Sequence, residues 1–479
     1  MRAAGQGTGT TTAGNARGEL RGLTGLRIVA AAWVVLFHFH FTPLPGVAEV
    51  VSVLGPLITA GALGVDLFFV LSGFVIAYTY LDKLGPRLRA GATVRFVWAR
   101  ASRMWPLYAL VFHVFGIWLV ARLVIGQDPD IAFQAVQPQV DLGEWVEQLF
   151  MAQMWTSPYL DGASWVGSTW SISAEWLAYL LFPVAALGFF RMRNLPLPVL
   201  AAATLLVMSP LAGAYLLLGT PYYPFSWLTR ILCGFGAGVL TYLTVRRLRS
   251  TEGARRTASA LAVALPVVLA GGLLLGDRIA PGRGGAVVAL FPLLVAAVAV
   301  ADRGPAMVLS TRWAVHGGHL SYALYLVHIP MLELYWLALR RFGWLAPDTV
   351  LAHVVGVAVV LATVPVAALA FRLVEEPARR RMRAMLPAAP PAGGNRERTQ
   401  PTLAPIEVPT AERPSADTVG RHASGREVVE RDLLTSAAPR HAAGPDRRAT
   451  LVSALIAASN QRPTALDGYP RPTRLQTGA

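Results

Sequence analysis

Ten separate runs of apolar residues constrain the fold of this chain more than any other feature. Each run is about 20 residues long, which is enough to cross the hydrocarbon core of a bilayer as a helix. Backbone polar groups inside lipid need partners within the protein, and a helix supplies them within one segment. The sequence therefore predicts an all-α polytopic membrane protein with about ten transmembrane helices. The runs lie near residues 25–43, 60–81, 104–125, 170–190, 195–218, 227–246, 257–276, 285–302, 320–341 and 349–373.

The composition excludes the main soluble alternatives. Apolar residues make up 54% of the chain and charged residues 14%, whereas soluble domains contain about 25% charged residues. A chain with this composition has too few polar side chains to cover the surface of a water-soluble protein. A scaffold built on internal disulfides is excluded as well, because the sequence contains a single cysteine.

Three regions follow from the distribution of the apolar runs. Residues 1–22 are rich in Gly and Thr and are expected to form a flexible N-terminal segment without a cleavable signal peptide. Residues 23–385 contain all the apolar runs and form the expected membrane domain. Residues 386–479 are rich in Pro, Ala, Arg and Thr and lack a sustained apolar period, so we expect a disordered cytoplasmic tail.

Basic residues are distributed unevenly between the two sides of the membrane. If the runs cross alternately, 24 Lys and Arg residues fall on the side of the N-terminus, 6 on the opposite side and 12 in the tail. Cytoplasmic loops carry an excess of basic residues, so both termini are expected in the cytoplasm. This orientation accounts for most of the net charge of +15, and nucleic acid is not expected as a partner. Lys83 is the only lysine, and Ala, Gly and Pro are abundant, which suggests the plasma membrane of a bacterium with a GC-rich genome.

Arg27 and His38 are two ionisable residues in the first apolar run. Titratable groups inside a membrane span are costly and mark functional sites by default. Helix geometry brings the two side chains to within about 20° of one face, about 16 Å apart along the axis. The sequence thus predicts a cation at the cytoplasmic edge and an imidazole deeper in the membrane. The alternative interpretation is a topology anchor and a packed histidine.

Asp66 and Glu175 are acidic residues at a depth similar to that of His38, in the second and fourth runs. A histidine that is oriented by a carboxylate can take a proton from a hydroxyl nucleophile. We therefore expect the three residues to converge in the outer half of the membrane, with either carboxylate orienting the imidazole. The alternative is a buried ion pair that only fixes helix packing.

Arg100 and Arg103 stand three residues apart at the cytoplasmic entry of the third run. Residues with this spacing share a helix face, and guanidinium groups bind phosphate oxygens bidentately. The alternative is that both arginines only determine topology. In the ninth run, His328 is followed by Glu333, and these two residues are expected either to line the same cavity or to pair locally.

The loop of residues 126–169 contains no Lys or Arg and is rich in acidic and aromatic side chains. One interpretation is that its aromatic residues anchor the protein at the membrane interface. The other is a surface on which sugar rings stack. The aromatic residues are Trp145, Trp155, Tyr159, Trp165 and, directly after the loop, Trp170.

Motifs of several other enzyme classes are missing from the sequence. It has no Zn-type ligand spacing, no Gly-rich phosphate loop followed by Lys, and no Gly-x-Ser-x-Gly elbow. We therefore expect neither a metal cofactor nor a soluble serine-hydrolase mechanism.

Taken in order, six motifs resemble those of the membrane-bound acyltransferase 3 family, whose members O-acetylate cell-surface glycans and some antibiotics. They are the Arg27–His38 spacing, Gly64–Phe74, Arg100-x-x-Arg103, Trp170–Pro183, Ser321–Pro330 and Phe371–Pro377, and together they cover roughly residues 20–383. Thr24 stands where the family often has Asp, and Ala178 where it often has an aromatic residue. The tail lacks the Gly-Asp-Ser of the esterase-like domain that some members carry.

This resemblance implies transfer of an acyl group, usually acetyl, from cytoplasmic acyl-CoA to an acceptor hydroxyl. The expected residues are His38, Glu175 and Asp66 for catalysis, Arg27, Arg100 and Arg103 for acyl-CoA, and Trp170, Tyr179 and His328 for the acceptor. The expected partners are the lipid bilayer, acetyl-CoA or another acyl-CoA, and the acceptor.

The class of acceptor stays open at this point. A carbohydrate or cell-envelope glycan matches the outer loop, whereas family members also acylate small natural products such as macrolides. A solute transporter or flippase is the competing class of function, because polytopic proteins with charges inside the membrane often move solutes. The sequence shows no repeated half and no pair of broken helices, which favours the enzyme.

Overall fold

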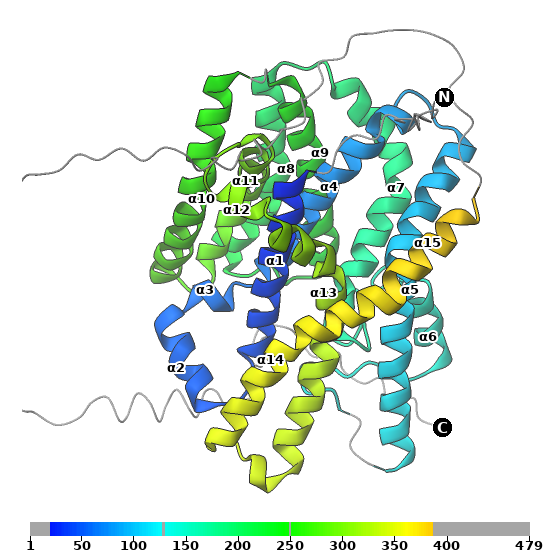
Figure 1. Cartoon of the computed structure of the whole chain (residues 1–479), viewed down its shortest axis with the longest axis vertical. Helices are drawn as coiled ribbons and strands as arrows, with labels where there is room; N and C mark the ends of the chain where they lie inside the picture. The colour runs from blue at the N-terminus through cyan, green and yellow to red at the C-terminus, as the bar shows by residue number, and fades with distance from the viewer. Residues whose placement is uncertain (1–19, 127–129, 249–250, 387–479) are drawn as a thin grey trace, which may run out of the picture. The chain divides into compact units, whose positions relative to one another are not determined.

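The computed structural model describes residues 20–126, 130–248 and 251–386 (Figure 1). Within these ranges every regular element is a helix. In the described part of the chain, ten helical segments are long and apolar enough to cross a membrane, which confirms the predicted all-α polytopic fold. The expected tail lies outside the described residues except for its first one, and so does most of the expected N-terminal segment, although α1 already begins at Arg21.

The helices follow one another with short connections, apart from the long loop between α5 and α7. Their bounds are α1 Arg21–Phe39, α2 Pro45–Leu54, α3 Pro56–Thr59, α4 Leu63–Leu84, α5 Ala90–Val124, α6 Leu142–Leu149, η1 Gly167–Thr169, α7 Trp170–Met192, α8 Leu197–Leu218, α9 Ser226–Arg247, α10 Glu252–Ile279, η2 Arg283–Leu290, α11 Phe291–Val300, α12 Pro305–Leu309, α13 Arg312–Arg341, η3 Gly343–Leu345, α14 Val350–Ala370, η4 Phe371–Glu375 and α15 Glu376–Ala384.

Helix α5 is much longer than the apolar run that predicted it. It begins at Ala90 and contains 35 residues, so at 1.5 Å per residue it measures about 50 Å, more than the roughly 30 Å hydrocarbon core. Its first turns carry Arg100 and Arg103. These arginines therefore lie within the same helix as the apolar run.

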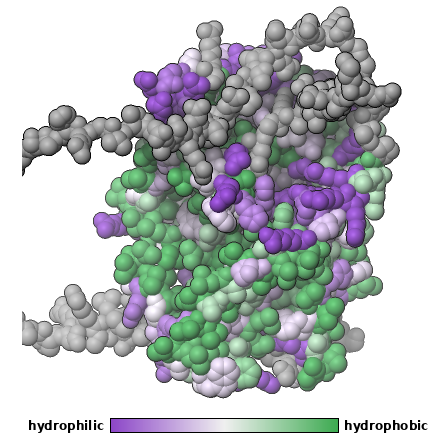
Figure 2. All heavy atoms as spheres, viewed as in Figure 1, coloured by the Kyte–Doolittle hydropathy of each residue, from purple (hydrophilic) through white to green (hydrophobic). Residues whose placement is uncertain are grey.

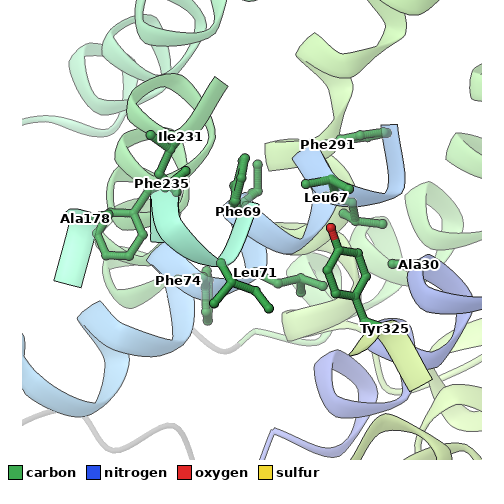
Figure 3. Close-up of a cluster of buried hydrophobic side chains, with 14 of the residues drawn as sticks. Ala30, Leu67, Phe69, Leu71, Phe74, Ala178, Ile231, Phe235, Phe291 and Tyr325 are labelled. Atoms are coloured by element: carbon green, nitrogen blue, oxygen red, sulfur yellow. The ribbon is translucent and has the colours of Figure 1, made fainter. Parts of the chain in front are cut away.

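Close approaches between helices depend on glycine. A Cβ atom on Gly73 of α4 would lie 2.0 Å from the backbone oxygen of Phe235, and one on Gly238 of α9 would lie 2.1 Å from that of Val70. Helices in lipid associate through tight van der Waals packing, which small residues permit. Figure 3 shows the resulting core, in which Phe69, Leu71 and Phe74 lie among side chains of neighbouring helices.

Helices α14 and α15 are joined by the π-helical turn η4. In Figure 1 they form one yellow rod that ends beside α5. Four of the nine residues of α15 are arginine, and hydrophilic side chains gather around it in Figure 2, while much of the remaining visible surface is apolar. We call this end of the bundle, where α1 and α5 begin and α15 lies, the arginine end. The opposite end, which carries residues 130–166, is the loop end.

Candidate active site

The imidazole rings of His38 and His328 face each other across the contact between α1 and α13. Nδ1 of His38 lies 3.1 Å from Nε2 of His328, and the two side chains are 6% and 0% exposed. The helices can approach because a Cβ on Gly318 of α13 would come within 1.9 Å of the Thr24 carbonyl oxygen in α1, so only glycine fits there. The structure thus brings the expected catalytic histidine into contact with a residue that was expected to bind the acceptor.

Hydrogen bonding assigns the protons of this pair. Nδ1 of His38 also lies 2.9 Å from the carbonyl oxygen of Val34, one turn earlier on α1. A carbonyl oxygen only accepts, so Nδ1 of His38 carries the proton and Nε2 of His328 accepts it as well. The neutral His38 ring then keeps its lone pair on Nε2. This nitrogen is the one that can take a proton from a hydroxyl group.

Asp66 pairs with Arg230 of α9 instead of orienting His38. Its two carboxylate oxygens accept hydrogen bonds from Nε and Nη2 of Arg230, each at 2.9 Å, and both side chains are fully buried. The expectation that Asp66 orients the histidine is therefore wrong, and the alternative of a buried ion pair describes it. The sequence signal for this partner is a cation inside the sixth apolar run, at Arg230.

Glu175 also has a partner other than His38. One of its oxygens accepts a hydrogen bond of 2.5 Å from the hydroxyl of Tyr179, and Ser72 Oγ of α4 lies 2.8 Å from the same hydroxyl. In the described part of the chain, the side-chain hydrogen bonds of His38 are those to Val34 and His328. The expectation that a carboxylate orients His38 is wrong for Glu175 too, because the α7 side chain is bonded within its own helix.

Arg27, Arg100 and Arg103, which we call the arginine cluster, lie close to one another near Tyr179. Arg27 is repelled by the nearby charge of Arg103 and attracted by the carboxylates of Glu175 and Glu375. Arg100 donates to the hydroxyl of Tyr80 at 3.3 Å and its guanidinium lies 5.9 Å from the centre of the Tyr179 ring. Nε of Arg27 and Nε of Arg100 are buried without a hydrogen-bond partner among the described residues. Buried cationic donors without partners are costly, so the cluster fits an anionic ligand.

Glu375 is a residue of this site that the sequence analysis did not single out. Its side chain is fully buried and pairs with Arg103. It is the last residue of the π-helical turn Phe371–Glu375, whereas the next residue, Glu376, pairs locally with Arg379 of α15. The available signal was the pair of adjacent acidic residues before Pro377. The structure shows that Glu375 is the acid that pairs with α5, through Arg103.

The three residues that were expected to bind the acceptor have different surroundings. His328 contacts His38, as described above. The hydroxyl of Tyr179 is hydrogen-bonded to Glu175 and Ser72. The ring of Trp170 packs over the guanidinium of Arg230, whose central carbon lies 4.8 Å from the ring centre. Two further rings lie edge-on to the candidate base His38: Phe37 of α1, with the ring centres 5.0 Å apart, and Phe133 of the loop, at 4.9 Å.

The aromatic residues of the loop contribute to packing within the loop and against α5. Trp165 is buried and donates from its indole nitrogen to the Gln139 carbonyl at 2.9 Å. Trp145 donates to a histidine of α5 at 3.1 Å. Trp155 and Tyr159 are 36% and 39% exposed, which are the largest exposed fractions among these five residues.

Asp161 anchors the same loop from within. Its carboxylate accepts a hydrogen bond of 2.9 Å from the backbone N–H of Val136. Burial raises the pKa of this carboxyl, and the backbone hydrogen bonds only partly offset the effect. Burial likewise raises the pKa of Glu144, at the start of α6.

Comparison with known proteins identifies one family. The model of the acyltransferase domain, acyltransferase 3, matches residues 20–372. No solved structure gives a significant match.

Two curated relatives match parts of the chain. "Acyltransferase MdmB" of Streptomyces mycarofaciens is 29% identical over 182 residues, which are 37% of this chain and 41% of that protein. "Protein 2 in picA locus" of Rhizobium radiobacter is 36% identical over 106 residues, which are 22% of this chain and 48% of that protein. The chain thus spans less than half the length of each of these relatives.

Proposed function

Because the chain belongs to the acyltransferase 3 family, we propose that it is an integral membrane O-acyltransferase. It transfers an acyl group, most simply acetyl, from acyl-CoA to a hydroxyl group of an acceptor. The observation that carries this proposal is the free lone pair on Nε2 of His38, which lies on the same helix as Arg27 of the arginine cluster. Acyl transfer from a CoA thioester needs two parts, a base for the acceptor hydroxyl and a group that binds the phosphates of CoA.

The reaction starts when Nε2 of His38 takes the proton of the acceptor hydroxyl. The acceptor oxygen forms a bond to the thioester carbonyl carbon, and the bond between that carbon and sulfur breaks. The proton held by His38 passes to the departing sulfur, so CoA leaves as the thiol and the base is restored. Throughout, Nδ1 of His38 donates to Val34 and His328, which keeps the ring in one orientation.

The arginine cluster would hold the phosphates of acyl-CoA. The unpartnered Nε atoms of Arg27 and Arg100 supply donors for an anion, and Arg103 is held in place by Glu375. Guanidinium groups bind phosphate bidentately. Arg27 and His38 are separated by about 16 Å along α1, so the thioester of an extended acyl-CoA would point from the cluster toward the base.

The charge distribution supports an orientation for the enzyme. The arginine end carries α15 and the start of α5, and basic residues favour the cytoplasmic side. We infer that the arginine end faces the cytoplasm, where acyl-CoA is available, and that both termini lie there, in a bacterial plasma membrane. The loop end then faces outward.

A carbohydrate of the cell envelope is the acceptor that we propose, because the loop end carries the exposed aromatic side chains Trp155 and Tyr159. The alternative acceptor is a hydroxyl of a small natural product, such as a macrolide. Mass spectrometry of envelope glycans and of secreted metabolites from a deletion strain separates the two. If the mass increment of an acetyl group is missing from one of these two pools of molecules, that pool contains the acceptor.

The proposed activity is tested with protein purified in detergent. Release of free CoA from acetyl-CoA should depend on the acceptor extract, and the substitution His38→Ala should lower this rate by at least about 10²-fold. His316→Ala is the matched control, since this histidine lies on α13 with an exposed side chain. Turnover that survives in His38→Ala would remove the proposed base, and solute uptake into vesicles without CoA release would favour a transporter.

A further inference from the structure

Glu333 lies on α13, five residues after His328, and its side chain binds the backbone of the loop. Its side chain is 1% exposed. One carboxylate oxygen accepts a hydrogen bond from the backbone N–H of Ala132 and the other from that of Phe133, each at 2.9 Å. Both oxygens of one buried carboxylate are thus used to hold two successive residues of the loop.

This contact determines where the loop backbone lies. Two charge-assisted hydrogen bonds satisfy the carboxylate, which would be costly to bury without them. The loop segment has no regular structure, and its backbone N–H groups need partners when they are removed from water. The two hydrogen bonds to Glu333 satisfy two of these groups. The segment around Ala132 is therefore fixed to α13 as well as to its own neighbours in sequence, where the Gln137 side chain bonds the backbone of Ile131.

Phe133 occupies the space beside the candidate base as a result. Its ring centre is 4.9 Å from that of His38 in an edge-on arrangement. The ring lies nearly parallel to Trp336 of α13, at 6.2 Å, and edge-on to Phe41 at 5.3 Å. With Phe133 in this position, His38 is 6% exposed.

We propose that Glu333 is a positioning residue that holds Phe133 as a plug on the loop-end side of His38. The plug keeps water away from the base, and the acceptor reaches His38 beside the ring of Phe133. This inference rests on the proposed acyl transfer, in which water is a competing nucleophile. If water enters, its oxygen bonds to the thioester carbonyl carbon, the carbon–sulfur bond breaks, and the products are the free carboxylic acid and CoA.

The first test measures this side reaction. In the purified protein without acceptor, Glu333→Ala and Phe133→Ala should raise CoA release from acetyl-CoA several-fold and lower the ratio of transfer to hydrolysis. Glu333→Gln retains one acceptor oxygen and should give an intermediate ratio. Asp161→Ala is the matched control: it removes the carboxylate that holds Val136 in the same loop but leaves the two bonds of Glu333, so its ratio should equal that of the unmodified protein.

The second test does not depend on catalysis. The single cysteine, Cys233, is buried, so Cys233→Ser combined with His38→Cys provides one thiol under the plug. A membrane-impermeant maleimide should label that thiol slowly, and the added substitution Glu333→Ala should raise the labelling rate several-fold, whereas Asp161→Ala should not. Thermal unfolding of each variant shows that it is folded.

The two tests separate the plug from the proposed function. Faster labelling in the Glu333→Ala background supports the plug even if no acceptor or acyl-CoA turnover is found, and in that case only the acyl transfer fails. Unchanged labelling and unchanged hydrolysis in folded Glu333→Ala protein overturn the plug. Equal acceleration by Asp161→Ala also overturns it, because the effect then comes from general loosening of the loop.

Discussion

Nδ1 of His38 on α1 lies 3.1 Å from Nε2 of His328 on α13, and both imidazole rings are buried. A second imidazole is a neutral acceptor, so it orients the candidate base without placing a negative charge in the membrane domain. The proton assignment depends on one further contact, the carbonyl oxygen of Val34.

Replacing His328 should slow catalysis without weakening the binding of acyl-CoA. His328→Ala removes the acceptor for Nδ1 of His38, and we expect kcat to fall about 10- to 100-fold with little change in KM for acyl-CoA. His328→Gln places an amide oxygen near the position of Nε2 and should restore most of kcat. A purely structural role predicts equal loss in both variants, which the comparison of their kcat values detects.

The ion pair of Asp66 and Arg230 should contribute to stability and not to chemistry. Asp66→Ala leaves a fully buried guanidinium unpaired, at a cost of about 3–5 kcal/mol in the free energy of unfolding. The double variant Asp66→Leu with Arg230→Met should recover much of this loss, and the fraction that folds should retain transfer. Unfolding in detergent gives the stabilities, and CoA release gives the activity.

Asp82 and Arg246 provide a control on the same two helices. This pair also joins α4 to α9, but its side chains are 22% and 28% exposed. Because water screens it, Asp82→Ala should cost only about 0–1 kcal/mol. A loss as large as that of Asp66→Ala would show that burial is not the cause of the difference.

Glu375 should act through Arg103. Glu375→Ala removes the carboxylate that holds this guanidinium, so we expect KM for acyl-CoA to rise about tenfold, in line with the loss of one charged hydrogen bond, while kcat changes little. Steady-state kinetics with varied acyl-CoA measure the two constants. Glu376→Ala, which removes the ion pairs with Arg379 and Arg380 but leaves the Glu375–Arg103 pair in place, should leave both near their original values.

The loop end should become more stable as the pH falls from neutral into the acidic range. Burial raises the pKa of Asp161 above its value in the unfolded chain, so the folded state binds this proton more tightly than the unfolded state. The stability that this proton contributes is present at low pH and is lost as the pH rises through the raised pKa. Asp161→Asn should flatten this dependence, which hydrogen exchange at the Val136 amide measures. An unchanged pH dependence in that variant would assign it to another group.

The sequence identified the residues of the site more reliably than their partners. The spacing of Arg27 and His38 on one helix depends only on helix geometry, and α1 is helical from Arg21 to Phe39. The partner of His38 could not be found in this way, because Asp66, Glu175 and His328 lie on three other helices at comparable depth. Depth along a span does not specify which side chains face each other, since this depends on the rotation and packing of each helix.

The membrane fold was determined by the sequence itself. Ten apolar runs demand ten helices because lipid offers no partners for the backbone, and this requirement is local to each run. The tertiary structure alone decided the pairing of His38 with His328, the Asp66–Arg230 pair and the position of Phe133. Each of these depends on contacts between distant segments: glycine-mediated helix packing in the first case, a buried cation on α9 in the second, and two backbone hydrogen bonds to Glu333 in the third.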